Sequence, residues 1–194
     1  MEGLMKGAAD KRRAALRGTH WSKEHPWCGA GSGVTEKGWF AAPRTLPLLL
    51  CMMREKTISR GKGDPSTVYV ELLSRQRGQG VVEMEAPDIH AFACGYRGAR
   101  GVRTWHERMA ILEKAGFIRT KSGNGRTYDL VFIVHPAVAV RRLKDQDLIS
   151  EQLLNTYLRQ QSSGERSYEE VVGEGKRRPV ATIVPIKPSR AARR

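Results

Sequence analysis

The chain has 194 residues, enough for one domain of ordinary size with added tails, and its hydrophobic content of 40% supports a buried core. A formal net charge of +14 favours a polyanionic partner, with nucleic acid ahead of an anionic membrane. No apolar run approaches the roughly 18 residues of a membrane span, no secretory signal is evident, and Cys28, Cys51 and Cys94 form no CxxC pair. We therefore expect a cytoplasmic protein that does not bind membranes.

Residues 1–38 are rich in Gly, Lys, Arg and Ser and show no sustained hydrophobic period. We expect a basic N-terminal arm that is flexible or loosely docked. We expect the later part of the arm to pack on the core, because it carries Trp21, Trp27, Trp39 and Phe40 and tryptophan is seldom left in solvent. The glycine-rich stretch 29–33 lacks the ending of a phosphate loop and no strand precedes it, so it predicts a linker.

Residues 39–162 contain the predicted folded domain. An apolar helix over 45–54 has Thr45 as its N-cap, and Asp64 caps a second helix that begins at Pro65. The other elements expected before and after the central stretch are a strand over 81–84, a helix over 87–94, and helices over 136–146 and 148–161.

The stretch 101–134 is the most informative part of the chain. It predicts an amphipathic helix over 101–115 that ends at Gly116, followed by a β-hairpin over 117–134 with its turn at 122–125. The side of the helix expected to face inward carries Val102, Trp105, Met109 and Leu112. The side expected to face outward carries Arg103, Glu107, Ala110 and Lys114.

Positive charge is concentrated in the same region. Residues 97–126 carry a net charge of +6, nearly all of the +7 of residues 39–162. Such local concentration is typical of a surface that contacts phosphates.

Several motifs of this region resemble the winged helix-turn-helix superfamily of bacterial DNA-binding regulators. They are Trp105-His-Glu-Arg-Met109, Leu112, Ala115-Gly-Phe-Ile118 and Tyr128-Asp-Leu130. The resemblance covers about residues 45–135 and is specific to the fold. The wider chain is similar to uncharacterised proteins carried on bacterial plasmids and mobile elements. The loop 95–101 is longer than the tight turn of the family, and residues 163–194 have no counterpart in it.

The resemblance implies an α+β fold: a mainly helical winged helix-turn-helix domain with a β-hairpin wing and added C-terminal helices. It implies that helix 101–115 enters the major groove of double-stranded DNA and that the wing 119–126 contacts the backbone. The expected DNA contacts are Arg97, Arg100, Arg103, Thr104, Glu107, Lys114, Arg119, Lys121, Asn124 and Arg126. An Arg can bond guanine bidentately, while a Glu can accept from cytosine or orient an Arg.

The expected role is regulation of transcription. Two alternatives remain: an accessory factor in plasmid replication, partition or transfer, and a winged helix that binds protein. No catalytic constellation is evident, and His20, His25 and Cys28 lack the spacing of a zinc site, so we expect no enzyme, no metal and no cofactor.

The C-terminal part of the chain leaves two further questions open. The apolar side of the helices over 136–161 has two equally plausible partners, the first helix of the domain or a second copy in a homodimer. We expect residues 163–194 to be a disordered linker and a basic tail that adds non-specific affinity for DNA.

Overall fold

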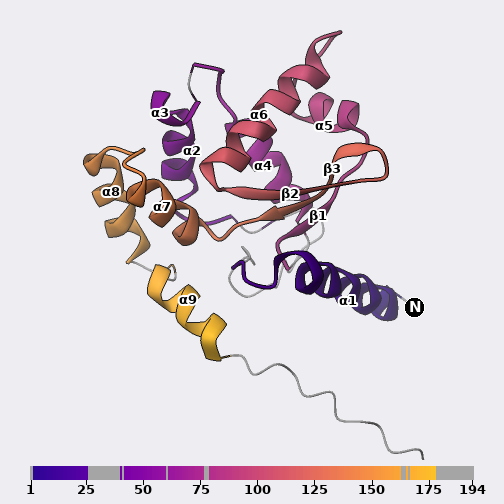
Figure 1. Ribbon diagram of the computed structural model, residues 1–194, viewed down its shortest axis with the longest axis horizontal. Coiled ribbons are helices and arrows are strands. Elements are labelled where there is room, and N and C mark those ends of the chain that lie inside the picture. Colours follow the sequence, from indigo (N-terminus) through magenta and orange to yellow (C-terminus); the bar gives the residue numbers. More distant parts are fainter. Residues whose placement is uncertain are drawn as a thin grey trace, which may run out of the picture.

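The computed structural model describes residues 2–25, 40, 42–59, 61–76, 79–162, 165 and 167–177. The predictions for Trp27, Cys28, Trp39, the stretch 29–33 and the tail from 178 onward lie outside the described residues. The fold is α+β, with helices packed around a small antiparallel sheet (Figure 1).

The centre of the chain follows the predicted order of elements. They are α4 (Ser66–Arg75), β1 (Val81–Glu83), α5 (Pro87–Ala93), α6 (Gly101–Ala115), β2 (Ile118–Gly123) and β3 (Arg126–Ile133). Gly116 ends α6 at a φ of 82°, a left-handed conformation that glycine adopts readily. Asn124 and Gly125, at φ of 50° and 72°, form the two-residue turn between β2 and β3.

The sheet has the strand order β1-β3-β2, and both pairs are antiparallel. Ile118 pairs with Ile133, and Val82 pairs with Val131. The register shifts between Lys121 and Gly123, so the hairpin is irregular near its tip.

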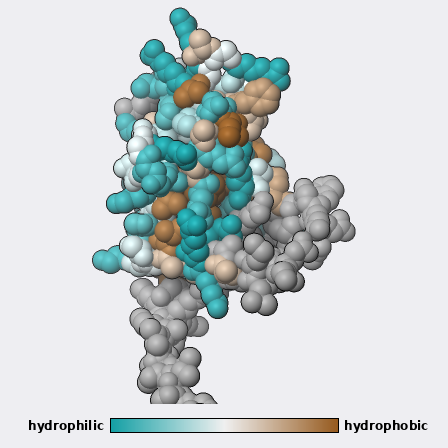
Figure 2. Space-filling model, turned by 90° about the vertical axis from the view of Figure 1, so that its right-hand side faces the viewer, coloured by the Kyte–Doolittle hydropathy of each residue, from teal (hydrophilic) through white to brown (hydrophobic). Residues whose placement is uncertain are grey.

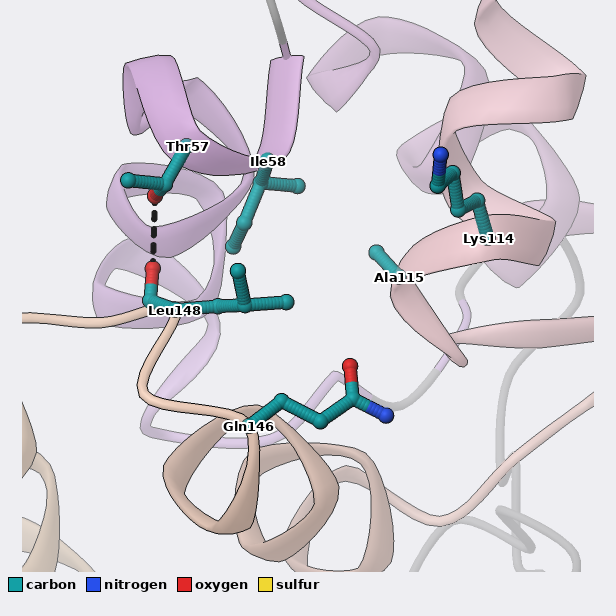
Figure 3. A pocket seen from close by; sticks show the side chains of 6 residues that line it. All are labelled: Thr57, Ile58, Lys114, Ala115, Gln146 and Leu148. Carbon is teal, nitrogen blue, oxygen red and sulfur yellow. Dashed lines mark hydrogen bonds between the residues drawn. The ribbon is translucent and has the colours of Figure 1, made fainter.

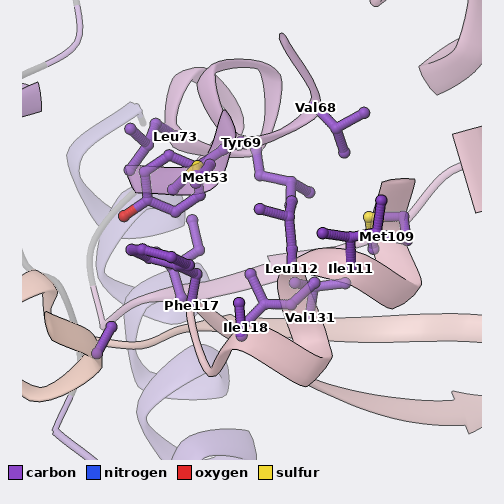
Figure 4. Close-up of a cluster of buried hydrophobic side chains, with 14 of the residues drawn as sticks. Met53, Val68, Tyr69, Leu73, Met109, Ile111, Leu112, Phe117, Ile118 and Val131 are labelled. Carbon is purple, nitrogen blue, oxygen red and sulfur yellow. The ribbon is translucent and has the colours of Figure 1, made fainter. Parts of the chain in front are cut away.

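The main core lies between one face of this sheet and helices α2 (Leu46–Arg54), α4 and α6 (Figure 4). Trp105, Met109 and Leu112 are buried in it, as the amphipathic pattern predicts. Val102 is an exception, because its side chain is 36% exposed. It lies in the first turn of α6, where it lines an open pocket beside α5 and not the core.

The two predicted N-caps have different outcomes. Asp64 accepts a hydrogen bond from the Ser66 N–H (2.8 Å). The N-cap residue is Pro65, however, so α4 begins one residue later than predicted. Thr45 occupies the N-cap position of α2 (Leu46–Arg54), as predicted, but its side chain makes no capping hydrogen bond. The Glu165 carboxylate accepts hydrogen bonds from both donors of Thr45. Its Oε2 accepts from the Thr45 hydroxyl (2.7 Å) and its Oε1 from the Thr45 N–H (2.8 Å).

The outer face of the sheet, opposite the main core, is covered by segments that the sequence did not predict to be helical. Glu2–Trp21 forms α1, which corrects the prediction of an irregular arm. Trp21 is buried and stacks on Phe132, with ring centroids 5.4 Å apart. Tyr168–Arg177 forms α9 within the stretch predicted to be disordered, and its Val171 is buried against the same apolar cluster. Long-range burial stabilises both helices where their local sequence patterns are weak.

The remaining helices of the described residues are α3 (Lys56–Ser59), α7 (Pro136–Asp145) and α8 (Glu151–Gln161). Helix α8 begins three residues later than the prediction of 148 because Leu148 and Ile149 first pack on the core as a connection. It lies beside α2, and Tyr157 is buried, so the apolar side of α8 has a partner within this chain. Among the described residues, no helix has the length and apolar character of a membrane span.

Candidate nucleic-acid interface

One face of α6 projects away from the core and forms what we call the outward strip: Arg103, Glu107, Ala110 and Lys114, all exposed. Arg103 Nε lies 3.2 Å from Glu107 Oε1, and the Arg103 side chain is 82% exposed. Exposed ion pairs of this kind contribute little stability. The Arg103 guanidinium is therefore accessible and oriented, but it is not held in place by burial.

The hairpin borders one side of the outward strip. Thr120 Oγ1 donates a hydrogen bond to the Glu113 carboxylate on α6. The Tyr128 ring stacks on His106 with centroids 5.4 Å apart and meets the edge of Trp105. Burial lowers the pKa of His106 below 6.5, so this histidine is mainly neutral at pH 7 and adds no positive charge.

The turn 61–64 borders the other side of α6. A Cβ on Gly63 would lie 2.3 Å from Arg108 Nη2, so the glycine permits close contact with the helix. Lys62 is exposed in this turn. Sequence reasoning missed Lys62; the only signal was a lysine between two glycines, Gly61 and Gly63, that both have positive φ.

The loop before α6 supplies cations at the start of the strip. Arg97 and Arg100 are exposed, and Thr104 is half-buried. A Cβ on Gly101 would lie 2.6 Å from the Tyr96 backbone oxygen, so the loop passes close to the first turn of α6. Arg97, Arg100 and Arg103 are thus exposed on the loop and the first turn of α6.

The predicted DNA contacts on the hairpin differ in their surroundings. Lys121, Asn124 and Arg126 are exposed near the tip, although Asn124 Nδ2 donates to both Asp129 carboxylate oxygens (3.0 Å each). Arg126 Nη1 donates to the Met84 backbone oxygen at 2.9 Å. These three hydrogen bonds hold the tip in place.

Arg119 does not join the strip. Its Nε lies 3.4 Å from Glu24 Oε1, and the other carboxylate oxygen of Glu24 accepts from Arg142 Nη2 at 2.9 Å. Glu24 follows α1, so Arg119 belongs to the contact between the N-terminal segment and the outer face of the sheet. Its guanidinium instead pairs with Glu24, a contact that the local sequence does not reveal.

A buried polar network lies beneath this surface. His90 Nδ1 is 2.9 Å from Glu71 Oε1, its Nε2 accepts from the Glu85 N–H (3.0 Å), and its ring stacks on Trp105. Because Nε2 is an acceptor, Nδ1 carries the proton and donates to the carboxylate. Burial, with the nearby charge of Glu71, raises the pKa of the Cys94 thiol to about 12. These features fix α5 against α4 and leave Cys94 an unreactive thiol.

A pocket of about 250 Å³ lies near the C-terminal end of α6 (Figure 3). Thr57 Oγ1 donates to the Leu148 backbone oxygen (2.7 Å) at its edge, and Lys114 is the only ionisable side chain among the described residues that line it. It presents no acid–base pair. No group of three or more His, Cys, Asp or Glu within the described part of the chain is placed to hold a metal ion.

Comparisons with known proteins found no matching family model, no matching curated protein and no matching solved structure.

Proposed function

We propose that this chain binds double-stranded DNA as a winged helix-turn-helix protein, with α6 in the major groove and the β2–β3 hairpin as the wing. The observation that carries the proposal is the outward strip of α6, with Arg103 and Lys114 exposed between the hairpin and the turn 61–64. The order helix, strand, two helices and hairpin from α4 to β3 is the order expected for this fold.

The chemistry of the strip suits base recognition. Arg103 lies near the N-terminal end of α6 and can donate two hydrogen bonds to a guanine, while Glu107 orients its guanidinium or accepts from a cytosine. Ala110 leaves room for close approach to a thymine methyl group. Each good bidentate contact contributes about 1–3 kcal/mol of discrimination against other bases.

The surrounding cations suit the sugar–phosphate backbone. Arg100 and Lys114 make no ion pair with any described residue, and Lys62 is exposed in the turn 61–64. Phosphate contacts set the position and orientation of the protein on the duplex without selecting sequence. We propose that Arg97, Lys121 and Arg126 add to this set from the loop and the wing.

The proposed biological role is regulation of transcription. Genome-wide binding footprints at promoters would support it, whereas footprints at a plasmid origin or a repeat array would favour the replication, partition or transfer role. The DNA-binding activity itself does not depend on which of these is correct.

The test is a fluorescence-anisotropy titration of the full chain on duplex DNA, repeated from about 50 to 200 mM salt. We expect the logarithm of the binding constant to fall steeply and linearly with the logarithm of salt concentration, because phosphate contacts release counterions. Absence of binding at low salt, or a flat salt dependence, would overturn the proposal. Lys114→Ala should reduce the slope, and Arg159→Ala, an exposed cation on α8, is the matched control.

A further inference from the structure

Helix α5 presents apolar side chains to solvent beside the proposed DNA interface. Phe92 is 66% exposed and Ile89 44%, while Val102 at the start of α6 is also exposed. Both α5 residues lie one turn apart on its outer side, opposite the buried His90 and Ala91. We call Ile89, Phe92 and Val102 the α5 patch. Folding alone does not account for an exposed group of this kind, which typically marks a binding surface.

The α5 patch lines an open pocket of about 550 Å³. The loop before α6 forms another side of it, where Gly98 has a φ of 78° and no atom within 4 Å of the position of a Cβ. Figure 2 shows hydrophobic surface among hydrophilic side chains at the height where α5 and this loop lie in Figure 1. The volume is within the range of sites that hold small organic groups.

The charge around the patch indicates what would occupy it. The Arg97 guanidinium lies over the Phe92 ring, 5.3 Å from its centroid, and Arg100 is exposed on the same loop. Asp88 lines the pocket and offers a carboxylate as a hydrogen-bond acceptor. These groups match the parts of a nucleotide. The Phe92 ring suits the face of a base, the arginines suit the phosphates, and the Asp88 carboxylate suits an exocyclic amino group.

The flat ring of Phe92 requires a base whose face is accessible. In an intact duplex the base faces are stacked on one another, and only their edges are open in the grooves. Unpaired bases in overhangs, bubbles and loops expose their faces and stack on aromatic side chains or on Arg guanidinium planes. Phe92 and Arg97 therefore suit an unpaired base better than a paired one.

We propose that the α5 patch binds an unpaired nucleobase through Phe92 and Arg97, so that the chain prefers DNA with a short unpaired stretch to fully paired DNA. The proposal rests on the DNA binding proposed above, and it adds a second contact that α6 and the hairpin do not provide.

The experiment compares three labelled probes by anisotropy with the full chain: a fully paired duplex, the same duplex with a central bubble, and the bubble with abasic sites in place of its unpaired bases. We expect the bubble probe to bind about five- to 150-fold more tightly than the paired duplex, the range for stacking of one base. The abasic probe should lose this preference, because it keeps the backbone and removes the base faces.

Phe92→Ala should abolish the preference and leave affinity for the paired duplex unchanged, while Phe92→Trp should retain it. Leu158→Ala, at an exposed apolar residue of α8, is the matched control and should behave as the unaltered chain. Circular dichroism of each variant checks that the fold is retained.

The outcomes separate the two proposals. Binding to the paired duplex without preference for the bubble would overturn this inference and leave the proposed function intact. A preference that survives in Phe92→Ala or on the abasic probe would show that the α5 patch is not the site. Failure to bind any of the three probes would overturn the proposed function and this inference with it.

Discussion

The cations around α6 and those on the outer face of the sheet have different surroundings. Arg100 and Lys114 make no ion pair with any described residue, and Arg103 pairs only with its exposed neighbour Glu107. By contrast, Arg119 and Arg142 share the half-buried carboxylate of Glu24. Net charge alone therefore does not locate a binding surface, because some cations hold terminal segments in place.

The largest effect that this comparison predicts concerns the docking of α1. Trp21→Ala removes the ring that stacks on Phe132 and should lower the free energy of unfolding by about 3–5 kcal/mol, the usual range for a buried Trp. Urea unfolding followed by circular dichroism measures it. Trp21→Phe should recover most of the loss, and an unchanged urea midpoint for Trp21→Ala would mean that α1 does not stabilise the sheet.

A matched pair of carboxylates provides the second prediction. Glu24→Gln leaves Arg119 and Arg142 without a countercharge, and because all three groups are partly exposed the expected loss is about 1–2 kcal/mol. Glu107→Gln, which breaks the exposed pair with Arg103, should change stability by less than about 0.5 kcal/mol. The same unfolding experiment measures both, and equal losses would remove the distinction between the two surfaces.

Salt dependence sharpens the comparison for DNA binding. Arg100→Ala should reduce the slope of log K against log salt by about 0.9, the value for one lost phosphate contact. Arg119→Ala should leave the slope unchanged, because its guanidinium is engaged by Glu24. If Arg119→Ala reduced the slope as much as Arg100→Ala, the assignment of Arg119 to the outer face would be wrong.

The smallest predicted effect is a pH dependence of stability. Burial lowers the pKa of His106 below 6.5, so the unfolded chain binds more protons and stability should fall as pH drops below 6.5. His106→Gln should flatten this decrease between about pH 7 and pH 5. Burial also lowers the pKa of His25, so part of this decrease in stability should remain in His106→Gln. Asp64 adds none in this window, since its pKa is already lowered below 3.8. A steeper loss of stability with falling pH in His106→Gln would contradict the attribution of this decrease to His106.

Local sequence patterns were sufficient to predict the secondary structure at the centre of the chain. The bounds 101–115 for α6, the cap Gly116 and the Asn124–Gly125 turn follow from helical spacing and from residues that adopt positive φ. Predictions of this kind succeed because their cause lies within a few residues. The same reasoning separated Trp105 from Arg103 on the two sides of α6.

The remaining differences arise from partners that are distant in sequence. Helix α1 contains three glycines and a weak apolar period, and Trp21 finds its partner Phe132 only in the folded sheet. Thr45 has the residue type of an N-cap, but Glu165 takes its hydrogen bonds. Arg119 matches the pattern of a wing cation, and only the fold places Glu24 beside it. None of these contacts could be inferred from local spacing.

Hydrogen exchange of the full chain, with and without a short duplex at low salt, locates the DNA-binding surface. If α6 and the hairpin bind DNA, backbone amides in 95–104 and 121–126 should exchange more slowly when DNA is bound, with α1 and α9 unchanged. Protection confined to α1 or α9, with no change at 95–104, would show that DNA binds elsewhere and would contradict the assignment of α6 and the hairpin as the interface.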